Sequence, residues 1–263
     1  MIADLHIHTT ASDGKYTPIE AVRWAKDSGI EVMSVTDHDS IDGLGEAEAG
    51  ARSLGIKFVP GIEISALAHC EVHVLGYNID YNNPDFATEL NAVKDMRRAR
   101  NIEIGKRLAG YGIKPNINFE DNGVGRMNIA RAMVEGGYVK DVSEAFDKYL
   151  GLGGKAYCTS KRITPKQAVE LVVKYGGFAS LAHPKRYLLD KRLDKMLAEL
   201  VPAGLRGLEV NYPSHFDSDK DALRAECKKY GLLPTGGSDF HGEENKHFTF
   251  NLDMRLIDAL HIQ

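Results

Sequence analysis

The sequence has few cysteines and no long apolar run. Three of its 263 residues are cysteine, and Cys70, Cys158 and Cys227 form no CxxC pair. This odd, dispersed set predicts neither a disulfide framework nor a thiolate zinc site, so we interpret all three as free thiols. No stretch approaches eighteen apolar residues, and the first residues lack the basic start and apolar core of a secretion signal. We therefore expect a soluble, cytoplasmic protein with no membrane partner.

Strong net charge is also absent. The chain carries −4 at pH 7, with 43% hydrophobic and 27% charged residues, which is ordinary for a globular protein and unlike a disordered one. The mild charge argues against tight binding to long nucleic acids. The length fits one domain, or one domain carrying an insertion, and no repeat indicates a solenoid.

Strand and helix patterns alternate along most of the chain. Thr17-Pro18-Ile19-Glu20 combines an N-cap residue, a proline at the first helical position and a glutamate three residues after the cap, and Gly29 ends this helix. Further strands are predicted at residues 31–36, 57–64, 178–182, 205–210 and 232–235, and further helices at 42–54, 165–175, from 183 to about 200, and 218–230. Repeated βα units predict a parallel sheet.

Residues 83–157 break this alternation. A long helical stretch over 91–108 is followed by a turn-rich segment and two shorter helices near Asn128 and Ser143. We interpret 83–157 as a helical insertion that acts as a substrate lid. It would divide one barrel domain into a first part, residues 1–82, and a second part, residues 158–263.

Two histidines, His6 and His8, lie two residues apart in a predicted strand. Positions i and i+2 of a strand point to the same face, so both imidazoles can reach one ion, although this spacing alone is as often incidental as functional. More evidence comes from motifs that lie where predicted strands end: Thr36-Asp37-His38-Asp39, Gly61-Ile62-Glu63-Ile64-Ser65, Val72-His73-Val74, Ala182-His183-Pro184 and Gly237-Ser238-Asp239-Phe240-His241. These motifs hold four of the ten histidines, and His6 and His8 bring the number at strand ends to six. Side chains at strand ends face the mouth of an α/β barrel.

The types of these residues restrict the cofactor. Imidazoles and carboxylates without thiolates suit Mn, Fe, Zn or Mg, and there are more of them than one ion can use. More than one divalent metal ion is therefore expected.

Together the motifs resemble those of the PHP family, the polymerase and histidinol phosphatase metal-dependent hydrolases, over nearly the whole chain. Within that family the chain is similar to TrpH-like phosphoesterases and nucleoside 3′,5′-bisphosphate phosphatases, which carry a helical insertion in a distorted (β/α)7 barrel. The resemblance implies an α/β fold of that kind and three metal ions. It also implies, motif by motif, the ligands His6, His8, Asp13, His38, Glu63, His73, His183, Asp239 and His241. Glu63 would bridge two ions, and Glu63, Asp13 and His183 are the candidate catalytic residues.

Several residues near these motifs have other interpretations. Asp13 precedes Gly14, and Asp-Gly is a common turn pair, so the alternative to metal binding is that Asp13 only forms a turn. Asp37 and Asp39 are expected to orient ligands or to cap the next helix. We do not expect His69 or His215 to bind metal. Trp24 is most simply a core or interface residue.

Two to three clustered divalent ions indicate a phosphoric ester hydrolase. Such ions lower the pKa of a bridging water toward neutrality, so hydroxide can attack phosphorus in line while the metals hold the phosphoryl oxygens. No nucleophilic side chain is needed. The sequence does not identify an acid for the leaving group, because the His and Asp candidates are all assigned as ligands.

The insertion is the expected source of substrate recognition. Residues 83–162 carry fourteen Lys and Arg against ten Asp and Glu, a net of +4, so the rest of the chain carries −8. This favours an anionic substrate with more than one phosphate, and a solvated helical face is the alternative. The candidate substrate-binding residues are Arg97, Arg100, Arg126, Asn128 and Lys155. Relatives use basic residues at the Arg126 and Lys155 positions but commonly read Gly-Arg-Pro-His where this chain reads Gly125-Arg126-Met127-Asn128.

We therefore expect hydrolysis of a small phosphorylated substrate, such as a nucleoside 3′,5′-bisphosphate or a short oligonucleotide cleaved from 5′ to 3′. A histidinol-phosphate phosphatase and a non-catalytic PHP module are the alternatives. The intact ligand set argues against the second, and the basic insertion suits a second phosphate better than an ammonium group. No obligate protein partner is evident.

Overall fold

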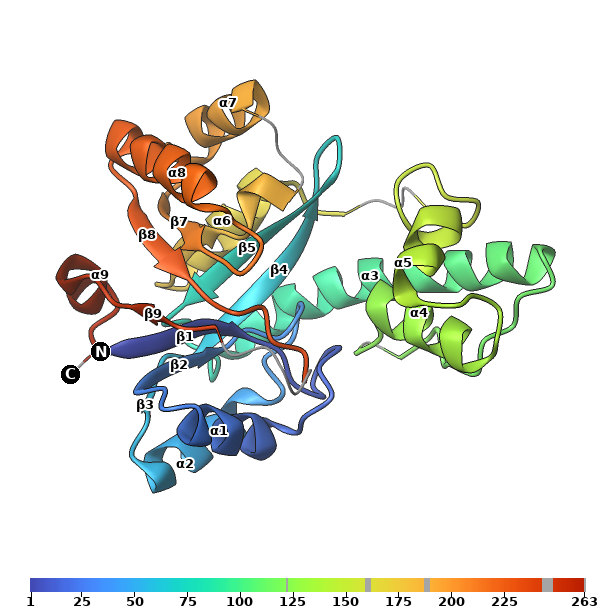
Figure 1. Cartoon of the computed structure of the whole chain (residues 1–263), viewed down its shortest axis with the longest axis horizontal. Helices are drawn as coiled ribbons and strands as arrows, with labels where there is room; N and C mark the ends of the chain where they lie inside the picture. Colours follow the sequence, from blue (N-terminus) through green and yellow to red (C-terminus); the bar gives the residue numbers. More distant parts are fainter. Residues whose placement is uncertain (122, 159–161, 187–189, 243–247, 263) are drawn as a thin grey trace. The chain divides into compact units, whose positions relative to one another are not determined.

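The computed structural model describes residues 1–121, 123–158, 162–186, 190–242 and 248–262 (Figure 1). The chain forms two compact units, one of Met1–Ala87 with Ile163–Gln263 and the other of Thr88–Arg162. The interrupting unit overlaps the insertion predicted at 83–157, with both of its bounds five residues further along the chain. None of the described helices is both long and apolar enough to cross a membrane.

The first unit contains two β-sheets. The four-stranded sheet has the order β3-β2-β1-β9, and the five-stranded sheet has the order β4-β5-β6-β7-β8. Their strands are β1 (Ile2–Ile7), β2 (Val32–Val35), β3 (Lys57–Phe58), β4 (Gly61–Leu67), β5 (Glu71–Tyr77), β6 (Phe178–Leu181), β7 (Leu205–Asn211), β8 (Leu233–Gly236) and β9 (Phe250–Asn251). Parallel pairs join β1 to β2, β2 to β3, β6 to β7 and β7 to β8, whereas β9 is antiparallel to β1.

The predicted α/β class is confirmed, but the sheets are mixed rather than wholly parallel. Strand β5 runs antiparallel to both β4 and β6. Only residues 68–70 connect β4 to β5, and so short a connection permits a hairpin but not the crossover that parallel strands require. Two isolated parallel bridges, His38 with Glu63 and Ile7 with Phe240, join the two sheets. Closure into a seven-stranded barrel stays a prediction.

Helices cover the sheets of the first unit (Figure 1). They are α1 (Pro18–Asp27), α2 (Leu44–Leu54), α6 (Pro165–Lys174), α7 (Asp190–Leu200), α8 (Asp217–Tyr230) and α9 (Met254–Ala259), with a 3₁₀ turn at Pro184–Arg186. The capping signal predicted for α1 is present: the Glu20 N–H donates to Thr17 Oγ1, and the Thr17 N–H donates to a Glu20 carboxylate oxygen at 2.8 Å. Helix α6 packs on β4, β5 and β6, and α8 packs on β7 and β8.

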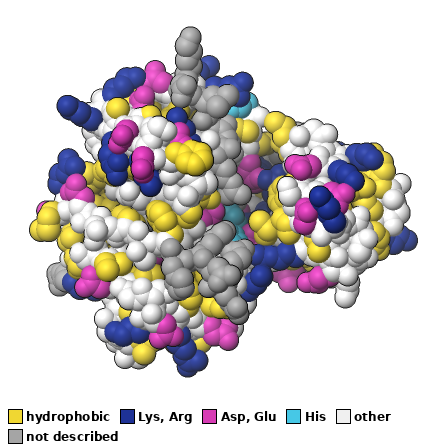
Figure 2. All heavy atoms as spheres, viewed as in Figure 1, with side chains coloured by type: hydrophobic (Ala, Val, Ile, Leu, Met, Phe, Trp, Pro, Cys, Tyr) yellow, Lys and Arg dark blue, Asp and Glu magenta, His cyan; other side chains and the backbone are white. Residues whose placement is uncertain are grey.

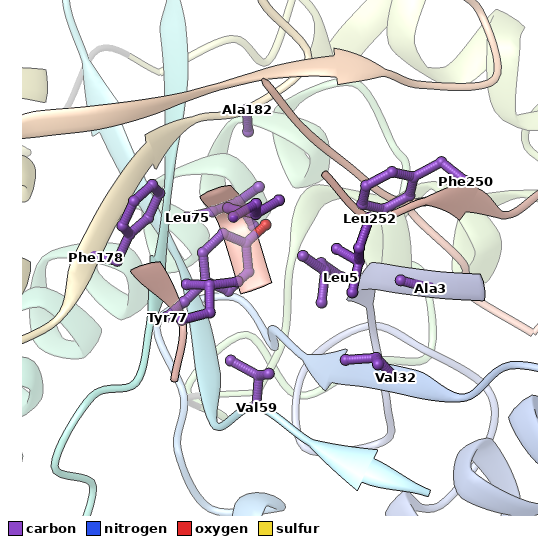
Figure 3. Close-up of a cluster of buried hydrophobic side chains, with 12 residues drawn as sticks. Ala3, Leu5, Val32, Val59, Leu75, Tyr77, Phe178, Ala182, Phe250 and Leu252 are labelled. Atoms are coloured by element: carbon purple, nitrogen blue, oxygen red, sulfur yellow. The ribbon is translucent and has the colours of Figure 1, made fainter. Parts of the chain in front are cut away.

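One hydrophobic cluster holds strands of both sheets together (Figure 3). Leu5 of β1 and Val32 of β2 meet Leu75 and Tyr77 of β5 and Phe178 of β6 in this cluster. Each fully buried Leu or Phe side chain contributes roughly 1.5–3 kcal/mol to folding. The cluster therefore fixes the strands whose ends carry the His, Asp and Glu motifs.

The second unit is helical. Its elements are α3 (Pro84–Gly110), which begins in the first unit, α4 (Arg126–Glu135), α5 (Val142–Ala145) and a π-helical turn at Phe146–Leu150. Ile104 and Leu108 of α3 and Ile129 and Met133 of α4 are buried in one cluster. Each pair is spaced by four residues, which places its two side chains on one face of the helix.

Candidate metal centre

Glu63 is at the centre of the site. Its side chain is buried in β4, and five imidazoles surround its two carboxylate oxygens. Oε1 lies 3.0 Å from His73 Nδ1, 3.0 Å from His183 Nε2 and 3.3 Å from His6 Nε2, and Oε2 lies 3.0 Å from His38 Nδ1 and 3.3 Å from His8 Nε2. One carboxylate thus touches side chains from four strand or strand-end segments.

Two further carboxylates extend the cluster. Asp239 Oδ1 lies 3.2 Å from His8 Nε2 and 3.4 Å from His6 Nε2. Asp13 Oδ1 lies 3.3 Å from His241 Nε2 and 3.6 Å from His8 Nδ1. The structure therefore brings all nine predicted ligands together, and Asp13 is part of the cluster as well as of a turn.

The ligand atoms form three overlapping groups: His6, His8, Glu63 and Asp239; His8, Asp13, His38 and His241; and His38, Glu63 and His73. Within each group the atoms lie within 4.8 Å of one another. His183 joins through Glu63 and through His73, whose Nδ1 is 3.3 Å from His183 Nε2. His8, His38 and Glu63 each belong to two groups, an arrangement that suits several ions sharing ligands.

The unsatisfied atoms of the site test whether metal ions fit. Among the described residues, His6 Nε2, both ring nitrogens of His8 and Glu63 Oε2 are buried without a hydrogen-bond partner. Buried polar atoms are normally paired, and leaving one unpaired costs about 1–3 kcal/mol. A divalent ion binds imidazole nitrogen and carboxylate oxygen at roughly 2.0–2.2 Å, which places neighbouring ligand atoms about 3 Å apart, as here. The residues present therefore fit divalent ions.

Burial and ion pairing set the protonation of the site. Burial opposes ionisation of Glu63, but His38, His73 and His6 hold the pKa of this carboxyl well below its usual range. Burial disfavours the charged form of His8 too, yet Asp239 and Glu63 raise the pKa of His8 to about 10. For His38, burial outweighs its carboxylate neighbours and lowers the pKa to about 4. Without a cation, the site at neutral pH therefore combines a protonated His8 with a neutral His38.

Backbone geometry at the strand ends orients the side chains of the candidate ligands. His183 follows β6 with φ of 27°, and Asp239 follows β8 with φ of 54°, both in the left-handed region that few residues other than glycine adopt. Gly237 permits a close approach of the Asp239 segment to β1, because a Cβ there would lie 2.3 Å from His6 Cβ. Any side chain at 237 would push the two segments apart.

The loop that carries Asp13 is held by Asp37. The carboxylate of Asp37 accepts hydrogen bonds from the Thr9 N–H at 2.7 Å, from Thr9 Oγ1 at 2.6 Å and from Ser12 Oγ at 2.5 Å. Asp39 accepts from the Ser65 N–H at 2.7 Å. Both residues support segments that carry ligands, in line with one of their two predicted roles, and the residue that caps α2 is Gly43 instead.

Sequence reasoning missed three buried groups that hold the ligands in place. Glu209 Oε1 lies 3.0 Å from His6 Nδ1, and Glu209 Oε2 accepts a hydrogen bond from the His183 N–H at 2.7 Å. Tyr212 donates to Asp239 Oδ2 at 2.8 Å. Asp4 accepts from the His6 N–H and from Ser238. The available signal was an acidic residue inside an otherwise apolar strand, as in Leu208-Glu209-Val210, because such residues are rarely buried without a partner.

The five candidate substrate residues lie in the other compact unit and outside the three ligand groups. Arg97 and Asn101 both donate to the Val124 carbonyl, and Arg100 donates to Asn101 Oδ1. Arg126 donates to the Leu150 carbonyl at 3.3 Å, and Asn128 Oδ1 accepts from the Gly125 N–H at the start of α4. The Lys155 ammonium lies 5.6 Å from the Tyr111 ring centre.

Three other residues have simple roles. Trp24 stacks on Phe240, with ring centres 3.8 Å apart, which agrees with its predicted packing role. His215 Nδ1 donates to the Val210 carbonyl. His69 and His215 fall outside the three ligand groups found among the described residues. The histidines of the site are largely hidden, and only small patches of histidine reach the face drawn in Figure 2.

The fold and the site together define an α/β protein with a buried multi-metal centre of imidazoles and carboxylates. A family model for the PHP domain matches residues 4–203, so the chain belongs to the PHP family. It is 35% identical over 245 residues to a 5′-3′ exoribonuclease of Haemophilus influenzae, covering 90% of this chain and 89% of that protein. It is 34% identical over 246 residues to a 3′,5′-nucleoside bisphosphate phosphatase of Chromobacterium violaceum, covering 90% and 86% of the two chains.

The solved structures agree on the fold. A structure of an amidohydrolase from Chromobacterium violaceum, with bound sulfate and no metal, aligns with a TM-score of 0.89 at 31% identity. The alignment covers 98% of this chain and 96% of that one. The likeness therefore extends over both compact units.

Proposed function

We propose that the protein is a metal-dependent phosphoesterase that hydrolyses a nucleotide, either a nucleoside 3′,5′-bisphosphate or the 5′ end of a short oligonucleotide. The observation that carries this proposal is the Glu63 carboxylate, which is buried among five imidazoles with Asp13 and Asp239 beside it. The activities for which the two relatives are named, exoribonuclease and bisphosphate phosphatase, support the substrate class.

The nine residues of the cluster would hold two to three ions of Mn, Fe, Zn or Mg. Bound ions would supply an activated water and would neutralise the phosphoryl oxygens. Glu63 would be shared between ions, because His6, His73 and His183 surround its Oε1 whereas His8 and His38 lie beside its Oε2. His8 and His38 each lie in two of the ligand groups, and each neutral ring would offer the lone pair of one nitrogen to an ion in one of them.

The chain's own groups fix how this centre is held. Tyr212 keeps Asp239 oriented by donating to one of its oxygens, which leaves Oδ1 facing His6 and His8. Asp37 holds the Thr9–Ser12 turn and so places Asp13 beside His241. A site supported in this way can bind a phosphate without reorganising, which is how preorganised groups accelerate phosphoryl transfer.

We also propose that the two bridged sheets form the distorted barrel expected from the family.

Arg97, Arg100, Arg126, Asn128 and Lys155 are proposed to recognise a phosphate or base that does not react. The support is the net positive charge of residues 83–162, together with the family resemblance, which implies basic residues at positions 126 and 155. Hydrogen bonds of Arg97, Arg100, Arg126 and Asn128 to groups of the same unit fix these side chains in place, which lowers the entropy lost on binding an anion.

The test is a substrate panel combined with metal analysis. The protein would be purified without chelator, its metal content measured, and phosphate release compared for histidinol phosphate, mononucleotides, nucleoside 3′,5′-bisphosphates and 5′-phosphorylated oligonucleotides. We expect two to three ions per chain, and the highest kcat/KM on the bisphosphate or the oligonucleotide. Preference for histidinol phosphate would reject the nucleotide assignment, and full activity without metal would reject the metal mechanism.

A further inference from the structure

Glu209 of β7 is a buried acidic residue outside the three ligand groups. Its exposed fraction is 0%, and its neighbours along the strand, Leu208 and Val210, are equally buried. An isolated carboxylate in such surroundings is costly, so its partners explain why it is tolerated. In the part of the chain that the structure describes, its two oxygens contact two candidate metal ligands, His6 and His183.

The first contact sets the tautomer of His6. A carboxylate oxygen can only accept here, so the bond of 3.0 Å between Glu209 Oε1 and His6 Nδ1 places a proton on Nδ1. The other nitrogen, Nε2, faces the space between Glu63 Oε1 at 3.3 Å and Asp239 Oδ1 at 3.4 Å, and it is the nitrogen that would give up its proton to bind a cation there. Nε2 has no hydrogen-bond partner among the described residues, which leaves it available to a cation.

The second contact holds the backbone of His183. The His183 N–H donates to Glu209 Oε2 at 2.7 Å, at a residue whose φ of 27° is unfavourable for a side chain with a Cβ. This turn brings His183 Nε2 to within 3.0 Å of Glu63 Oε1. One carboxylate therefore controls the side chain of one imidazole and the backbone of another, and both imidazoles converge on the same oxygen of Glu63.

We propose that Glu209 is a positioning residue of the metal centre, which fixes the Nδ1–H tautomer of His6 and the turn at His183 so that both imidazoles face Glu63. The inference rests on the proposed metal function, but its tests measure metal binding and protonation rather than phosphate release. If the unmodified protein bound metal normally but hydrolysed no phosphate ester, that result would count against the proposed function and not against this role of Glu209.

The informative variant is Glu209→Gln, because an amide has the same shape but only one accepting oxygen. If that oxygen accepts from His183, the amide NH₂ faces His6 Nδ1 and moves the ring proton to Nε2, where it blocks a metal. If it accepts from His6, the His183 N–H loses its acceptor. We expect metal affinity, measured by chelator competition, to fall about 10–100-fold, as for other groups that orient metal-bound histidines.

Two control variants separate positioning from general damage. Thr235→Val alters the residue paired with Glu209 on β8 and removes a hydrogen bond to Ser180, and Thr235 is outside the three ligand groups found among the described residues. Glu226→Gln makes the same chemical change on α8. Both should retain the metal affinity of the unmodified protein. If Glu209 served only the fold, Glu209→Gln would lower the Tm of the metal-free protein and leave metal affinity unchanged, and that result would overturn the proposal.

A double variant and a measurement on the unmodified protein complete the test. In a His6→Gln background, Glu209→Gln should cost less metal affinity than in the unmodified protein, because the two residues act through one contact. An equal cost would contradict the coupling. In the zinc-loaded protein with ¹⁵N-labelled histidine, the His6 ring proton should reside on Nδ1. A proton on Nε2 would refute the assignment even if Glu209→Gln failed to fold.

Discussion

The Glu63→Gln substitution gives the sharpest test of the site. The change keeps the shape of the side chain but removes its charge and one of its two accepting oxygens. Five imidazole nitrogens lie 3.0–3.3 Å from those oxygens, so every orientation of the amide places an NH₂ group against at least two of them. The amide can still accept on one side, but it cannot be shared between two cations.

The expected loss of metal affinity follows from the burial of Glu63. Removing one partner from a buried, paired set of charges costs about 3–5 kcal/mol. At 1.36 kcal/mol for each tenfold change, this corresponds to roughly 10²–10⁴-fold in affinity for the ions that Glu63 shares. We expect at least one ion to be absent after gel filtration in metal-free buffer, and phosphatase activity to fall with it. The fold should persist, because the hydrophobic cluster of Figure 3 is untouched.

Metal content by mass spectrometry, affinity by calorimetry and Tm by calorimetric scan would be measured on the same preparations. Glu71→Gln is the matched control, because Glu71 lies at the start of β5, outside the three ligand groups, and its carboxylate is 3.8 Å from His73 Nε2. Its affinity should change less than about tenfold, in line with a partly exposed contact. Retention of all ions by Glu63→Gln, with affinity within tenfold of the unmodified protein, would refute the assignment of Glu63 as the shared ligand.

Other predictions concern protons and the second unit. Burial opposes the charged forms of His6 and His8, but carboxylate neighbours keep the pKa of His6 well above 6.5 and raise the pKa of His8 to about 10. Both rings are therefore protonated at pH 7 without metal. Loading metal should release about two protons in a pH-stat titration, and the metal affinity should rise with pH. Asn128→His should lower Tm through loss of the Gly125 bond and, if the position is catalytic, raise turnover with a new pH-dependent limb; an unchanged profile would exclude that role. Arg126→Ala or Lys155→Ala should reduce kcat/KM for a bisphosphate by a factor that corresponds to about 2–4 kcal/mol, and far less for a chromogenic monophosphate. Equal losses on both substrates would mean that these residues position the reacting phosphate or support the fold.

The sequence predicted much of the site because ligand motifs repeat at the ends of strands. His73 shows the limit of that reasoning. It lies near the start of β5, not at its end, and it reaches the cluster because β5 runs antiparallel and pairs His73 with Ser65 near the end of β4. Position within a strand becomes position in space only when strand direction is known. Direction here depended on the short connection over residues 68–70.

The supporting residues were invisible for a different reason. Glu209 is 203 residues from His6 in the sequence, and Tyr212 is 27 residues from Asp239. Nothing in local spacing links such residues, and a hydrogen bond between them is evident only after folding. The charge count of residues 83–162 predicted a basic unit. A count does not show which group each basic side chain contacts, so it could not predict that Arg97 donates to the Val124 carbonyl.

Charge balance explains how a chain of net charge −4 can attract a phosphate. Glu63, Asp13 and Asp239 contribute −3 to the cluster, and their carboxyl pKa values are all held below the usual range. Two divalent ions contribute +4 and a third makes the centre strongly positive, so the loaded site attracts an anion although the surrounding unit is acidic. Metal-free protein, with His6 and His8 protonated, keeps a negative cluster. Inorganic phosphate, titrated by calorimetry, should therefore bind the metal-loaded protein about tenfold or more tightly than the metal-free protein. Equal affinity in the two forms would show that side chains, and not the metal centre, supply the phosphate site.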